Sequence, residues 1–301
     1  MQTFRVSATG HSVNYLPEYV ASWQGFFAAE GLEVSATVPS PWDLVLDEIG
    51  SGQAEAALGG IWVPSMFLGR ATRYTPFAQV SARAPLALVG REARRAFDWQ
   101  MLRGRTVMMK GSNGASVGLF IKMLLQENGI DPREVGFVQD LDGKMLATLF
   151  AGGMGDFLVV DSPSALALEA RGGGTIATLL ADSGGGVPWS VYYAPGDSDA
   201  ARLEVQAGFT RALARGMDWV LGHEAASFSD FLGRIFPRFG VEELVRLVDL
   251  YRRVGMWTTP RIDQASYDRW QRGIAAGHLT AAPIPYGTLI DSRPAMMAGL
   301  A

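Results

Sequence analysis

Apolar residues fall into two alternating patterns along the chain. Short runs of β-branched and apolar residues predict buried strands, and between them apolar residues recur every three or four positions, as in amphipathic helices. Strands and helices that alternate in this way are typical of a parallel α/β fold. In the first part of the chain we predict strands at residues 4–8, 33–38, 54–58 and 77–81, and helices at residues 17–29, 42–51 and 61–68.

The pattern starts again after an apolar run at residues 86–89. Further strands are predicted at residues 105–109, 135–138, 157–160 and 191–193, and further helices at residues 117–128 and 144–150. The remaining residues are mainly helical, and 301 residues exceed the usual size of one core. We therefore predict two α/β lobes with a ligand cleft between them. Residues 1–87 and 191–301, including the helical C-terminal region, form the first lobe, and residues 88–190 form the second.

Polar and aromatic side chains follow the first predicted strand. The loop carries His11, Ser12, Asn14 and Tyr15, which are side chains suited to recognition. Open α/β folds bind ligands at the carboxyl edge of their parallel strands, where this loop is expected to lie. We therefore predict that these four residues bind ligand, although a single loop histidine is also common as an ordinary surface residue.

Aromatic residues stand at the ends of other predicted strands. Trp42 follows the second strand, Gly60 and Trp62 follow the third, and Trp189 precedes a strand in the return to the first lobe. Indole rings can stack on an apolar or heteroaromatic solute and offer an N–H donor. The chain has eight tryptophans, so core packing is the competing interpretation for each of them.

Two loops of the second lobe offer further contacts. The GSNGAS loop carries Ser112 and Asn113 before a helix, whose free N–H groups could hold an anionic oxygen. Asp161 opens the next helix after a buried strand and could accept a hydrogen bond from a ligand. Helix capping is the simpler interpretation of both loops and is compatible with binding. Lys110 and Arg83 are few cations for a dianion, which favours a neutral or singly charged solute.

Composition excludes several classes of function. Lys and Arg number 26 against 30 Asp and Glu, a formal net charge of −4 without a basic patch, so nucleic acid is not expected as a partner. The absence of cysteine excludes thiolate catalysis, disulfides, iron–sulfur clusters and cysteine zinc sites. The three histidines are scattered, so we expect no metal ion, and nothing in the sequence indicates a cofactor.

The predicted cellular compartment depends on whether a signal peptide has been removed. No apolar run approaches the roughly 18 residues that span a bilayer, and the N-terminal residues lack the features of a signal peptide. We expect a periplasmic protein if a signal peptide has been removed and a cytoplasmic one if Met1 is the native start.

The ordered set of motifs resembles one family. Pro17, Ala21 and the run GFF-x-x-x-GL-x-V match the opening of the type II periplasmic-binding-protein fold in the group of sulfonate-binding and thiamine-pyrimidine-synthase-like proteins. The LRGRTV, AGGMGDFLVVDSP and GHLTAAPIPYGTLID segments match its later parts, so the resemblance covers nearly the whole chain. It implies two lobes that close on a small solute. It also implies a monomeric solute-binding protein, with the permease of an ABC-type importer as partner.

Enzymes share this architecture and supply the alternative. The segment ALGGIWVPSMFLG is similar to the stretch with two adjacent glycines and a following proline in aromatic sulfinate desulfinases. Those enzymes use a Cys in the first loop and an Arg before the two glycines, where this chain has His11-Ser12 and Ala57. We therefore predict binding of an aromatic, heteroaromatic or sulfonate-like ligand without turnover. A cytosolic decarboxylase, hydrolase or desulfinase-like enzyme that uses His11 is the alternative.

Overall fold

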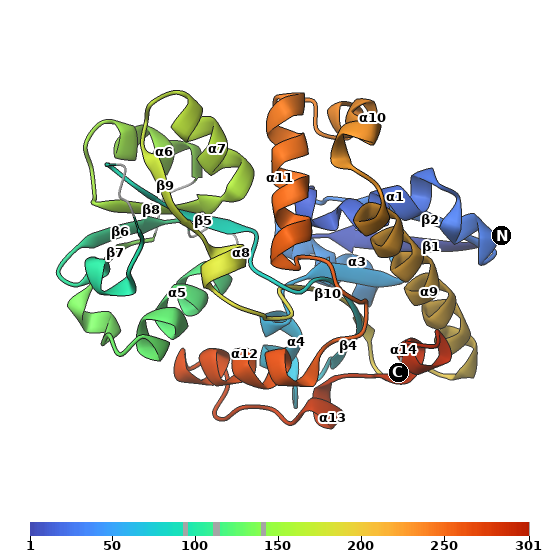
Figure 1. Cartoon of the computed structure of the whole chain (residues 1–301). Helices are drawn as coiled ribbons and strands as arrows, with labels where there is room; N and C mark the ends of the chain where they lie inside the picture. Colours follow the sequence, from blue (N-terminus) through green and yellow to red (C-terminus); the bar gives the residue numbers. More distant parts are fainter. Residues whose placement is uncertain (93–95, 111–114, 140–142, 301) are drawn as a thin grey trace. The chain divides into compact units, whose positions relative to one another are not determined.

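The protein is built from two compact units, each around its own five-stranded sheet (Figure 1). The computed structural model describes residues 1–92, 96–110, 115–139 and 143–300. Unit 1 comprises Met1–Ala82, Val187–Ser227 and the residues from Tyr251 onward, and unit 2 comprises Arg83–Gly186 and Phe228–Leu250. The predicted α/β class with two lobes is confirmed, because the strands form two separate sheets rather than one.

The sheet of unit 1 has the strand order β2-β1-β3-β10-β4. Strands β1, β2 and β3 are parallel, and Phe4 lies opposite Val34 in the β1–β2 register. Strand β10 runs antiparallel between β3 and β4, although it is far from both in sequence. The bounds are β1 (Gln2–Ala8), β2 (Leu32–Thr37), β3 (Ala56–Gly59), β4 (Tyr74–Ser81) and β10 (Ser190–Pro195).

Aromatic side chains fill the core on one face of this sheet. The Phe209 ring from the long helix α9 lies 4.8 Å from Phe4, 5.0 Å from Phe27 and 4.8 Å from Tyr192, between ring centroids. Phe4, Phe209 and Tyr192 are almost completely buried. Because buried aromatic pairs contribute beyond the area they remove from water, this cluster fixes α9 on the sheet.

The single helix predicted at residues 17–29 is wrong. The chain forms α1 (Leu16–Trp23) and α2 (Phe26–Ala29), separated at Gly25, whose φ is 72°. Only glycine adopts this left-handed conformation readily, so the helix ends there. The other helices of unit 1 are α3 (Val45–Gly50), α4 (Trp62–Phe67), α9 (Ala200–Gly222), α12 (Gln264–Ala276), α13 (Tyr286–Leu289) and α14 (Arg293–Met297).

Unit 2 repeats the topology of unit 1, with strand order β7-β6-β8-β5-β9. Strands β6, β7 and β8 are parallel, and β5 lies antiparallel between β8 and β9. The bounds are β5 (Leu86–Gly90), β6 (Thr106–Met109), β7 (Gly136–Val138), β8 (Phe157–Asp161) and β9 (Thr175–Leu179). The sequence prediction did not include β9, whose residues are only half buried and follow three glycines.

The continuous segment of unit 2 forms the helices α5 (Ser116–Glu127), α6 (Gly143–Ala151), α7 (Ser162–Ala170) and α8 (Leu180–Ser183). The segment Phe228–Leu250 adds α10 (Ser229–Ile235) and most of α11 (Val241–Val254). The sequence prediction had assigned this whole segment to the first lobe. Among the described residues, no helix is long and apolar enough to cross a membrane.

Candidate functional site

In unit 1 the loop after β1 has an accessible part and a buried part. His11 is exposed and stacks on Tyr19 with ring centroids 4.9 Å apart, and Ser12 is half buried. Asn14 and Tyr15 are buried, with 2% and 6% of their surface exposed. Of the four predicted loop residues, His11 and Ser12 are therefore the accessible ones.

Asn14 ties this loop to three other segments of unit 1. Its Nδ2 donates to Ser81 Oγ at 2.7 Å and to Ser190 Oγ at 3.4 Å. Its backbone oxygen accepts from Trp257 Nε1 at 2.8 Å, and its Oδ1 accepts from the Ser12 hydroxyl. Because a buried amide is costly unless it is hydrogen-bonded, this network fixes the conformation of the loop.

The three tryptophans of unit 1 predicted to bind ligand each pack against another tryptophan. Trp62, at the start of α4, is 9% exposed and packs edge-on against half-buried Trp42, with centroids 6.1 Å apart. A Cβ added to Gly60 would lie 2.5 Å from Trp62 Cδ1 and Nε1, so the glycine makes room for the indole. Trp189 stacks on Trp270 at 6.2 Å. Packing against a second ring therefore accounts for part of the position of each indole. A role of these tryptophans in ligand binding stays a prediction.

Sequence reasoning missed a buried carboxyl group in unit 1. Glu18 of α1 is 3% exposed and accepts a hydrogen bond from the Tyr192 hydroxyl of β10. Burial raises the pKa of Glu18 from 4.5 to about 7, and the bond from Tyr192 opposes that rise. The neighbouring apolar residues gave no sign of this pairing, because Tyr192 is 174 residues away in sequence.

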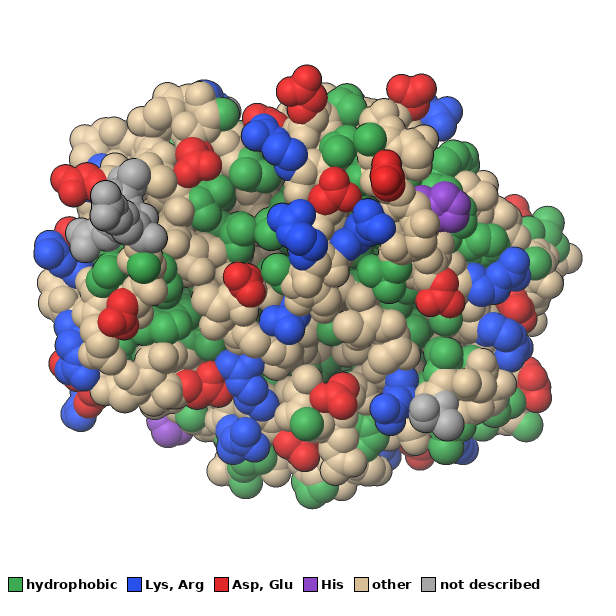
Figure 2. Space-filling model, viewed as in Figure 1, with side chains coloured by type: hydrophobic (Ala, Val, Ile, Leu, Met, Phe, Trp, Pro, Cys, Tyr) green, Lys and Arg blue, Asp and Glu red, His purple; other side chains and the backbone are tan. Residues whose placement is uncertain are grey.

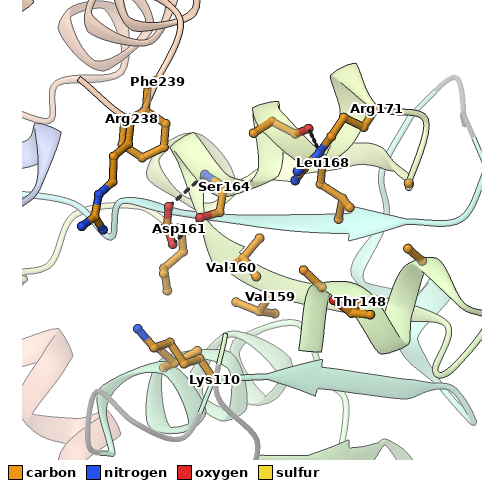
Figure 3. Close-up of a pocket in the computed structure, with 16 residues that line it drawn as sticks. Lys110, Thr148, Val159, Val160, Asp161, Ser164, Leu168, Arg171, Arg238 and Phe239 are labelled. Atoms are coloured by element: carbon orange, nitrogen blue, oxygen red, sulfur yellow. Dashed lines mark hydrogen bonds between the residues drawn. The ribbon is translucent and has the colours of Figure 1, made fainter. Parts of the chain in front are cut away.

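In unit 2 a pocket of about 950 Å³ opens beside the C-terminal end of β8 (Figure 3). Its walls come from α6, α7 and the ends of β6 and β8, and from the loop between α10 and α11. Asp161 and Lys110 line it, as does Leu86 at the start of β5. The predicted Ser112 and Asn113 lie outside the described residues.

Asp161 caps α7, as the sequence predicted. Its carboxylate accepts from the Ser164 backbone N–H and from the Ser164 hydroxyl, both at 2.9 Å. The side chain is nevertheless exposed at the pocket, so the capped carboxylate can still accept a bond from a ligand. Arg83, which the sequence placed near the cleft, donates to the backbone oxygen of Ala181 at 3.0 Å.

Two further cations, Lys110 and Arg238, line the pocket. Neither Lys110 nor Arg238 forms an ion pair or hydrogen bond with the residues that the structure describes. In the view of Figure 3 the Arg238 side chain lies above that of Lys110, and both charged ends lie to the left of Asp161. Two cations against one carboxylate leave this opening positive by one charge, which suits an anionic group.

Arg238 and Phe239 are pocket residues that sequence reasoning missed. They lie in the loop between α10 and α11, within the segment that joins unit 2 from far along the chain. No strand end or motif marks the FPRFG stretch as a binding loop. Elsewhere on the molecular face drawn in Figure 2, acidic and basic side chains are interspersed. Within the described residues, no group of three potential metal ligands comes together.

Comparison with known proteins identifies the family. The family model described as "NMT1/THI5 like" matches residues 12–227, well over half of the chain. The chain belongs to this family. The predicted resemblance to sulfonate-binding and thiamine-pyrimidine-synthase-like proteins is thereby confirmed.

Proteins similar to this NMT1/THI5-like chain carry the names of binding proteins and of an enzyme. "Putative binding protein YtlA" of Bacillus subtilis (strain 168) is 26% identical over 297 residues, covering 96% of this chain and 87% of the relative. The periplasmic sulfonate-binding protein SsuA from Methylobacillus flagellatus KT has a TM-score of 0.73 at 16% identity, covering 99% and 94% of the two chains. The desulfurization enzyme DszB has a TM-score of 0.63 at 15% identity, covering 99% of each chain. These two structures show the shared fold.

Proposed function

We propose that this NMT1/THI5-like protein is the solute-binding component of an ABC-type importer and takes up a small organic anion of the sulfonate or carboxylate kind. The observation that carries the proposal is the pair of cations at the opening of the unit 2 pocket, Lys110 and Arg238, neither of which pairs with another residue that the structure describes. The similarity in fold to a sulfonate-binding protein supports it.

The charge balance indicates the kind of head group. A single sulfonate or carboxylate would offset the excess positive charge beside Asp161, whereas a dianion would exceed it. The guanidinium of Arg238 can hold such a group through two parallel N–H donors, and the Lys110 ammonium adds a point charge. The Asp161 carboxylate suits an N–H or O–H donor on the same ligand.

Binding without turnover fits the first loop better than catalysis does. A serine nucleophile needs a base that accepts its proton, but the Ser12 hydroxyl donates to Asn14 rather than to the neighbouring His11. The chain also has no cysteine. We propose that His11, Ser12, Trp42, Trp62 and Trp189 contribute to binding rather than to chemistry, and that the protein acts outside the cytoplasm as a monomer.

The test is a binding screen with matched variants. Thermal-shift and calorimetric titrations with short sulfonates and carboxylates should find ligands of the wild-type protein. Lys110→Ala should weaken the best of them about tenfold or more, by analogy with other hydrogen bonds to charged groups. Arg238 is exposed and therefore more strongly screened, so Arg238→Ala should have a smaller effect.

Arg234→Ala is the matched control, because Arg234 is an exposed arginine at the end of α10 that does not line the pocket. Equal effects of Arg234→Ala and Arg238→Ala would count against the pocket as the anion site. Mass spectrometry of the incubated ligand tests turnover, and consumption in proportion to protein concentration would support the enzyme alternative. Fractionation of cells that express the complete gene would test the location.

A further inference from the structure

The pocket of unit 2 continues as a groove between two helices. Helices α6 and α7 pack on the same face of the sheet, since Leu146 and Phe150 of α6 and Leu168 of α7 share one core cluster with Leu158 and Val160 of β8. The pocket lining follows both helices away from Asp161, as far as Gly173 beyond the end of α7. In Figure 3 the lining residues extend in this way from Asp161 to Arg171 and Thr148.

The groove exists because small side chains stand between the two helices. Ala147 and Ala151 lie next to the core residues of α6, and Ala167 lies next to Leu168 on α7. Methyl groups at these positions are too short to close the gap that larger side chains would fill. The three alanines therefore line an open groove in an otherwise packed layer.

The residues that line the groove are mostly apolar, with Thr148 and Ser164 as polar exceptions. Val160 and Leu168 are 6% and 5% exposed and line it together with the alanines. At the far end Arg171 donates its Nε to the backbone oxygen of Ala167 at 2.9 Å, and the side chain is otherwise exposed. Its aliphatic stem can thus cover apolar surface while the charge stays in water.

Lys110, Arg238 and Asp161 at one end, with mostly apolar walls between them and Arg171, suit an amphiphilic ligand. At 1.5 Å per residue, the nine residues of α7 give the groove a length of about 13 Å. We propose that this groove takes the unbranched aliphatic tail of the ligand, with its anionic head at Lys110 and Arg238, and so selects ligands by chain length. The inference rests on the proposed function, because it assumes that the head group binds at these cations.

The test is a chain-length series on the purified protein. Linear alkanesulfonates and alkanecarboxylates of two to ten carbons are titrated by calorimetry, with alcohols of the same lengths as uncharged probes. Affinity for both anion series should rise about two- to fourfold per methylene, as expected for a chain that is transferred from water into a partly open groove, and should level off when the tail reaches its end. The alcohols should bind much more weakly at every length.

Ala147→Leu tests the location of the tail. The added carbons would occupy the groove and should weaken the longest anions at least fivefold while leaving the two-carbon anions within twofold. Ala170→Leu is the control, since Ala170 is an exposed residue of α7 outside the pocket lining, and it should leave the series unchanged. Both substitutions exchange the same residue types within a helix.

The outcomes separate the two proposals. If short anions bind but affinity is independent of chain length, or if Ala147→Leu weakens short and long ligands equally, the tail groove is refuted and the anion site stands. If no anion of either series binds, the proposed ligand class fails and the groove fails with it.

Discussion

The buried Glu18 predicts an unusual dependence of stability on pH. Its pKa is about 7 in the folded protein and near 4.5 when the carboxyl is exposed, so the folded state retains a proton that the unfolded state releases. Between these two values the free energy of unfolding should fall as pH rises, by about 1.4 kcal/mol per pH unit, and the total loss is about 3 kcal/mol. Below pH 4.5 this contribution is fully present, and above pH 7 it has been lost.

Glu18→Gln isolates this contribution. The amide has the shape of the protonated carboxyl and can still accept from the Tyr192 hydroxyl, but it does not titrate. Between pH 5 and pH 8, wild-type protein should lose on the order of 2–3 kcal/mol more stability than the variant. Urea denaturation followed by tryptophan fluorescence is a suitable assay, because all tryptophans except Trp99 lie in unit 1, together with Glu18.

Glu33→Gln supplies the control for this experiment. Glu33 is an exposed residue of β2 in the same unit, and its replacement should leave the wild-type pH dependence in place. The hydrogen bond from Tyr192 lowers the pKa of Glu18. Tyr192→Phe removes this bond and should therefore move the upper limit of the pH-dependent range above 7. An unchanged pH dependence in Glu18→Gln would refute the assignment of a buried, protonated carboxyl.

Two further predictions concern the candidate site. Gly60→Ala should displace the Trp62 indole, change its fluorescence and weaken ligand binding. Gly50→Ala, whose new methyl group meets no atom within 4 Å, should do neither, and equal behaviour of the two variants would show that Gly60 does not set the indole position. Asp161→Asn should keep the cap on α7 and strengthen anion binding by removing a negative charge, whereas Asp161→Ala should cost about 1 kcal/mol of stability. Denaturation and calorimetry would check both, and weaker anion binding by Asp161→Asn would contradict the charge argument.

The sequence predicted the elements whose signal is local. The parallel strands of both sheets were found because each is a short apolar or alternating segment between helical patterns, and the Asp161 cap was found because Asp-Ser-Pro is a local helix start. Strand β9 escaped because half-buried residues give neither a continuous apolar run nor a clear alternation. The break at Gly25 escaped because a glycine inside a helical pattern is often tolerated.

The parts of the site that could not be predicted depend on long-range packing. Nothing near Arg238 in sequence shows that its loop joins unit 2, and Glu18 becomes unusual only through Tyr192. The division between accessible His11 and buried Asn14 likewise follows from side chains at positions 81, 190 and 257. Strand-end position indicates where a ligand could bind, but burial decides which of the neighbouring residues can touch it.

The position of β10 in unit 1 has a consequence for synthesis of the protein. Strands β3 and β4 are both complete by residue 81, yet they are not neighbours in the sheet, because β10 separates them. The sheet of unit 2 lies entirely within residues 86–179. A ribosome therefore releases every strand of unit 2 before the first sheet can close, and β4 has no native strand partner until residue 190 has emerged. The sheet of unit 2 can therefore form before that of unit 1 is complete, and β4 must wait for β10 although β1, β2 and β3 can already pair.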